Sequence, residues 1–280
     1  MSRELFNIND GRSLPWTLAS IDFNSIDTDS ARKREDVFVL VCSSSFIESG
    51  SDLYTQNLVR HFPDDIALQT WLSQHWEQEE LQHGRALSAY IQHVWPEFDW
   101  HAAYQCFWNE YSKQCLTEYL EQSRGLELVA RCVVETGTAS LYRALSTMRV
   151  EPVLTRLAAN IMSDEIRHYK NFYHHFKRYR ENEQLSRLQI LAAILRRVGA
   201  IRNEDSDIAL RHVFNERYPL LHGNHREYRR VASATAALLR NHGSTGMAVK
   251  MLLKPLGLSS QLEDVFEKPL ALISRKLFLH

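Results

Sequence analysis

Two copies of a Glu-x-x-His pattern, Glu80–His83 and Glu165–His168, are the residues of this 280-residue chain best suited to chemistry. With 21 glutamates and 13 histidines, about one such pattern is expected by chance, so the two copies are weak evidence by themselves. A spacing of three nevertheless puts a carboxylate and an imidazole on the same side of a helix, where both can bind a metal ion.

The sequence around both motifs predicts that they face a protein core. Residues three or four apart form two stripes, which read Leu72, Trp76, Glu80, His83, Leu87, Tyr90 and Leu154, Ala158, Ile161, Glu165, His168, Phe172. An ionised carboxylate on such a stripe is costly unless a partner compensates its charge. Glu135 lies on a third apolar stripe, and Glu48 follows a serine run with no basic residue nearby.

Four predicted helices therefore carry Glu, Glu-x-x-His, Glu and Glu-x-x-His, in that order. Four carboxylates balance two divalent cations, and two neutral imidazoles complete the ligand set. Carboxylates with little imidazole favour iron, with manganese as the alternative, whereas the absence of thiolates argues against zinc or an iron–sulfur cluster. This arrangement is a known rule of di-metal helical bundles. The predicted metal ligands are Glu48, Glu80, His83, Glu135, Glu165 and His168.

Each of these residues also has an ordinary interpretation. A core histidine is more often a hydrogen-bonded structural group than a ligand, and Glu48 could begin a helix. Glu77 and Glu79 are interpreted as a solvated flank of the first motif. The joint pattern favours the metal site, because the ordinary interpretation requires six separate coincidences of order and helical face.

The composition excludes several classes of protein. The net charge of -1 argues against a nucleic-acid binder, and the longest purely apolar run, Val37 to Cys42, is too short to span a membrane. The N-terminus shows no secretion signal, and the four cysteines form no Cys-x-x-Cys pair. A cytoplasmic protein is expected.

Only 10 glycines and 7 prolines occur, which favours long helices and an all-α fold. Residues 1–30 are predicted to be an N-terminal arm, 31–180 the di-metal bundle, and 181–280 additional helices packed on it. The helices are expected at 31–62, from the Pro63-Asp64-Asp65 break to Val94, within 97–125, and at 126–148, 152–180, 185–199, 206–218, 226–241 and 260–277.

The strings Glu79-Glu80-Leu81-Gln82-His83-Gly84 and Asp164-Glu165-Ile166-Arg167-His168 resemble the two iron-binding motifs of soluble acyl-acyl carrier protein desaturases. That family belongs to the ferritin-like superfamily, and the resemblance covers about residues 35–180. It implies a ferritin-like four-helix bundle, to which the helices predicted from the pattern of residues 181–280 are additional C-terminal helices. It also implies that Glu80 and Glu165 bridge two irons, that Glu48 with His83 completes one iron, and that Glu135 with His168 completes the other.

The resemblance also assigns a role to Thr138, three positions after Glu135. Its hydroxyl would lie near the oxygen-binding side of the irons and relay a proton, although it could equally be a packed residue of the next helical turn. The radical-carrying subunit of ribonucleotide reductase has a tyrosine at the position of Leu87, and arylamine N-oxygenases have a further histidine at the position of Ile161. Both therefore fit less well than a desaturase.

The resemblance implies an O2-dependent di-iron oxidoreductase that desaturates or hydroxylates an acyl chain on a carrier protein. An external electron donor such as ferredoxin and a homodimeric assembly are expected with it. The alternatives are a ferritin-like iron- or manganese-binding ferroxidase without an organic substrate, and a di-metal N-oxygenase-type oxidase. The apolar residues of the stripes either line a substrate pocket or simply form the core; they are Trp76, Leu87, Tyr90, Tyr142 and Phe172.

Overall fold

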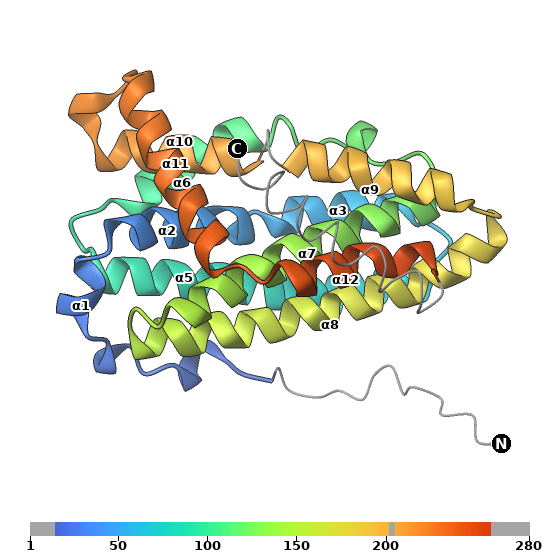
Figure 1. Ribbon diagram of the computed structural model, residues 1–280, viewed down its shortest axis with the longest axis horizontal. Helices are drawn as coiled ribbons and strands as arrows, with labels where there is room; N and C mark the ends of the chain where they lie inside the picture. Colours follow the sequence, from blue (N-terminus) through green and yellow to red (C-terminus); the bar gives the residue numbers. More distant parts are fainter. Residues whose placement is uncertain (1–14, 202–204, 259–280) are drawn as a thin grey trace.

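The structure, a computed structural model, describes residues 15–201 and 205–258, which form helices and turns with no strand among them. Four long helices run along the molecule: α2 (Glu35–Ser49), α5 (Glu77–Val94), α7 (Arg124–Met148) and α8 (Pro152–Asn182) (Figure 1). Helix α2 packs on α5, α7 packs on α8, and α5 also contacts α8. The all-α prediction is confirmed for this part of the chain.

Further helices surround these four. They are α1 (Thr28–Arg32), α3 (Ser51–His61), α4 (Ile66–Trp71), α6 (Trp100–Tyr111), α9 (Arg187–Ile201), α10 (Asp205–Arg217), α11 (His225–His242) and α12 (Thr245–Leu253). Helices α9, α11 and α12 pack on α7, and α10 packs on α2 and α6. None of the helices among the described residues is long and apolar enough to cross a membrane.

The ends of the central helices follow local sequence signals. The Ser123 side chain accepts a hydrogen bond from the Leu126 N–H and begins α7, whereas Glu151 caps α8 ahead of Pro152. Helix α7 ends at Met148, and the next residue, Arg149, has a left-handed φ of 48° that turns the chain back towards α8. These signals set the α7–α8 hairpin.

One predicted helix is divided in the structure, one helix of the structure was not predicted, and one predicted helix lies outside the described residues. The helix expected at 31–62 is divided at Gly50 into α2 and α3, because glycine is a weak helix former. Helix α12 has no predicted counterpart, since it is short and contains Gly246. The helix expected at 260–277 lies outside the described residues, as do residues 1–14 of the predicted arm.

Two apolar clusters fill the interior of the bundle, and on α7 and α8 the chemistry-bearing residues lie between them in sequence. On α8, Val153–Ile161 belong to the first cluster and Tyr169–Phe176 to the second. Glu165 and His168 come between these segments. On α7 the second cluster comes first in the sequence: Glu135 lies between Val133 of the second cluster and Tyr142 of the first. The bundle therefore contains one buried polar layer between two apolar layers.

Candidate metal centre

The six predicted ligands converge in this polar layer. Helix α2 supplies Glu48, α7 supplies Glu135, and α5 and α8 each supply a Glu-x-x-His pair. None of the six is more than 6% exposed. Their ligand atoms form two groups, within each of which all atoms lie within 4.8 Å of one another. The groups are Glu48, Glu80, His83, Glu165 and Glu80, Glu135, Glu165, His168.

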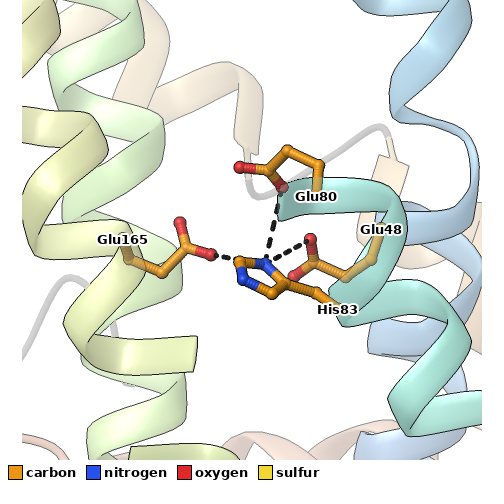
Figure 2. A group of neighbouring side chains, drawn as sticks. All are labelled: Glu48, Glu80, His83 and Glu165. Carbon is orange, nitrogen blue, oxygen red and sulfur yellow. Dashed lines mark ion pairs between the residues drawn. The ribbon is translucent and has the colours of Figure 1, made fainter. Parts of the chain in front are cut away.

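The two shared glutamates each face both histidines. Glu80 places Oε1 2.9 Å from Nδ1 of His168 and Oε2 4.0 Å from Nδ1 of His83. Glu165 places Oε1 3.3 Å from Nδ1 of His83 and Oε2 3.9 Å from Nδ1 of His168. Figure 2 shows the first group, with Glu165 approaching His83 from the helix opposite Glu48. Each of these glutamates presents one oxygen to each histidine and is therefore able to contribute a ligand to each of two cations.

Each histidine is oriented by a carboxylate outside the cluster. Nε2 of His83 lies 3.0 Å from Asp164, and Nε2 of His168 lies 2.6 Å from Glu79. Burial raises the pKa of Asp164 and Glu79, but their partners outweigh it and lower both values. Ionised carboxylates can only accept, so each Nε2 carries the hydrogen and donates it. When either imidazole is neutral, its free lone pair is therefore on Nδ1, which points into the cluster.

Four polar atoms of the cluster are buried without a hydrogen bond. They are Nδ1 of His83, Nδ1 of His168, Oε2 of Glu135 and Oε1 of Glu165. Such orphaned atoms are rare and costly in native interiors. Two cations placed among them would satisfy all four, so this carboxylate and histidine cluster is able to hold a metal pair.

Without a cation, the cluster favours protonation of its two histidines and of two of its carboxylates. Burial alone lowers the pKa of His83 and His168, but the facing carboxylates outweigh it and raise both values well above the usual one. Burial and the neighbouring Glu165 raise the pKa of Glu80, and burial raises the pKa of Glu135 to about 8. Protons and metal ions therefore compete for the same atoms.

Three carboxylates of the cluster are held by a donor on one oxygen. The Tyr142 hydroxyl donates to Oε1 of Glu48, and Trp76 Nε1 donates to Oε1 of Glu135 over 3.2 Å. Thr138 Oγ1 donates to Oε2 of Glu165 over 2.6 Å. Thr138 thus touches the cluster, as a partner of a shared glutamate.

A close helix contact brings Glu48 to His83. A Cβ atom on Gly84 would lie 2.7 Å from the backbone N of Ser49 and 2.9 Å from its Cα. Glu48 and His83 immediately precede these two residues. Only glycine permits this approach of α2 and α5, so the last residue of the first motif has a structural role.

A π-turn precedes the first motif. Residues Leu72–Trp76 (η3) form it between α4 and α5 without interrupting the helical run. π-helical turns are rare in proteins as a whole, but those that occur are often found at functional sites. Here the turn ends at Trp76, whose indole binds Glu135.

Sequence reasoning missed several residues around the cluster. Glu79 was expected to be solvated, but its side chain is 12% exposed and binds His168, so that interpretation is wrong. Asp164 was noted only as part of a motif. Trp16, from the predicted arm, donates from Nε1 to Asp164 over 2.7 Å and stacks on His83. The one signal in the sequence that could have identified Glu79 and Asp164 is that each is a carboxylate directly before a motif glutamate.

The apolar residues of the stripes form core. Leu87, Tyr90, Tyr142 and Phe172 are at most 1% exposed, and Trp76 is 5% exposed. Two open surface pockets among the described residues have no member of the cluster in their lining. These pockets, of about 430 and 180 Å³, lie at the end of α8 and between α3 and η3.

The sequence matches no protein-family model and no curated protein. Among solved structures, a tyrosine-to-phenylalanine mutant of an R2-like ligand-binding oxidase with an aerobically reconstituted Mn/Fe cofactor is similar. Its TM-score is 0.54 at 15% identity, over 87% of this chain and 88% of that chain. A glycine-to-leucine mutant with an Fe/Fe cofactor gives 0.53 at 16% identity, over 87% and 88%. This likeness shows a shared fold, and the predicted ferritin-like helical bundle is confirmed.

Proposed function

We propose that this protein binds two iron ions, or iron with manganese, and is an O2-dependent oxidoreductase. The observation that carries the proposal is the pair of bare Nδ1 atoms, each faced by one oxygen of Glu80 and one of Glu165. Glu48 and His83 would complete the ligand set of one ion, and Glu135 and His168 would complete that of the other. Oxygen ligands with one imidazole per ion suit iron and manganese.

The similar solved structures support the choice of metals and of reaction class. They are oxidases by name, and their cofactors are Mn/Fe or Fe/Fe pairs. A bound pair of ferrous ions would supply two electrons to O2 together, one from each ion. The chain orients each imidazole through Asp164 or Glu79 and excludes water with the apolar layers on either side. Thr138, bonded to Glu165, is placed to hold or pass a proton at that carboxylate.

The finer proposal concerns the substrate. The desaturase-like motifs favour an acyl chain on a carrier protein as the group that is desaturated or hydroxylated. An external donor such as ferredoxin would supply electrons, and a homodimer is the proposed assembly. These parts rest on the resemblance of the motifs alone.

Metal reconstitution tests the proposal. Purified apoprotein is loaded anaerobically with Fe²⁺, its metal content is measured, and the loaded protein is then exposed to O2 with and without acyl-carrier substrates. We expect two ions per chain, O2 consumption, and a Mössbauer spectrum of a coupled iron pair. The Glu165→Gln and His168→Ala variants should lose metal.

The matched control is Glu151→Gln, because Glu151 is equally buried but caps α8 outside the cluster. This variant should retain both ions. Wild-type protein that binds no metal, or equal metal in the ligand variants, contradicts the proposal. Two ions with O2 uptake but no acyl oxidation would favour the ferroxidase alternative over the desaturase.

A further inference from the structure

The two carboxylates that orient the histidines share one cation. Arg167 Nη1 donates to Oδ1 of Asp164 over 2.6 Å, and Nη2 donates to Oε1 of Glu79 over 2.8 Å. The other oxygen of each carboxylate faces a histidine: Oδ2 of Asp164 faces His83 and Oε2 of Glu79 faces His168. One guanidinium thus contacts the supports of both halves of the cluster.

These supports cross between the two helices. His83 belongs to α5 but is held by Asp164 of α8, whereas His168 belongs to α8 but is held by Glu79 of α5. Each support also immediately precedes a shared glutamate in the sequence. Any change in the spacing of α5 and α8 therefore disturbs both histidines together.

Only an arginine suits this position. Its planar guanidinium presents N–H groups along two edges and can bind two carboxylates at once, whereas an ammonium is a point charge. The side chains of Asp164 and Glu79 are only 1% and 12% exposed, so water cannot replace the lost cation fully. Arg167 itself is 37% exposed and reaches solvent.

We infer that Arg167 is a positioning residue that sets the orientation of both histidine ligands at once and so couples the two metal sites. This inference rests on the proposed metal pair. Loss of a group that supports a metal ligand typically lowers affinity about 10–100-fold. Because Arg167 supports both histidines, its loss should weaken both ions, whereas loss of Asp164 or Glu79 should act chiefly on one.

Binding of Co²⁺ at constant pH, followed by calorimetry, tests the inference on the full chain. We expect Arg167→Gln to weaken both ions about 10–100-fold and Arg167→Lys to give an intermediate loss. The matched control is Arg211→Gln, because the Arg211 side chain is 38% exposed and pairs with Glu110 away from the cluster. This control should bind both ions as wild type does.

Proton NMR of the Co²⁺-loaded protein measures a property that would not change if Arg167 only stabilised the fold. The hyperfine-shifted Nε2–H signals of the two histidines should exchange slowly with solvent. Asp164→Asn and Glu79→Gln should each speed the exchange of one signal, which assigns it, and Arg167→Gln should speed both. If Arg167→Gln does not fold, Arg167→Lys carries the same test.

The outcomes separate the two claims. Unchanged affinity and exchange in the arginine variants, or a change at one histidine alone, overturns the coupling role while leaving the metal pair intact. Wild-type protein that binds no pair of Co²⁺ ions contradicts the proposed function instead.

Discussion

Replacing Gly84 by alanine should separate α2 from α5 and weaken the metal centre. The new Cβ would lie 2.5 Å from Oγ, 2.7 Å from the backbone N and 2.9 Å from Cα of Ser49. Carbon atoms pack comfortably at roughly 3.5–4.0 Å, so the helices must move apart by about 1 Å. The hydroxyl can rotate away, but the two backbone atoms cannot.

Two opposing effects decide the stability of the Gly84→Ala variant. Alanine in a helix interior stabilises by about 1 kcal/mol relative to glycine, whereas overpacking costs roughly 1–3 kcal/mol. Because backbone atoms are in the way, overpacking should prevail, with a net loss of up to about 2 kcal/mol. Denaturant unfolding of the metal-free protein measures this loss. Metal affinity should fall too, since Glu48 and His83 adjoin the contact.

The control for this substitution is Gly137→Ala, two residues after Glu135 in α7. Nothing lies within 4 Å of a Cβ at Gly137, so alanine there should stabilise by up to about 1 kcal/mol. The two variants should therefore change stability in opposite directions. One result would refute this reasoning: Gly84→Ala gains stability as Gly137→Ala does, and its metal affinity equals that of wild type. The close contact between α2 and α5 would then not position the cluster.

Three further predictions concern protons and hydrogen bonds. Metal uptake should release protons, and the metal should be lost as the pH falls. The reason is that the cluster histidines and Glu135, whose pKa without a cation is about 8, bind protons at the same atoms as the metal. Calorimetry in buffers of different ionisation enthalpy measures the proton release, and metal uptake without proton release would refute the competition. Thr138→Val removes the 2.6 Å bond to Glu165 and should cost about 1–3 kcal/mol and slow the reaction with O2. Thr136→Val, which removes only a bond to a backbone carbonyl, serves as its control, and equal O2 rates in the two variants would refute a special role. Burial lowers the pKa of His175 to about 4, so the unfolded chain binds the extra proton between about pH 4 and 6.5. Stability should fall by up to about 3 kcal/mol as the pH drops through that window, and a His175→Phe variant with the same pH dependence of unfolding would contradict this assignment.

The sequence alone determined the spans of α7 and α8 and the faces of the central helices that are buried. Apolar residues three or four apart predicted the extent of α7 and α8 within two residues, because this periodicity is a local property of one helix. The same periodicity placed Glu80, Glu135 and Glu165 on core-facing stripes. Burial of charge without a local partner then predicted that these residues lie together.

Only the tertiary structure decided which residues support the cluster. Glu79 looks like a solvated flank in the sequence, because its partner His168 is 89 residues away. Trp16 gives no sign in the sequence that it covers His83, and Gly84 gives none that it meets Ser49. Periodicity shows which side of a helix is buried. Contacts between helices depend instead on the spacing and rotation of the helices, which are set by packing of the whole bundle.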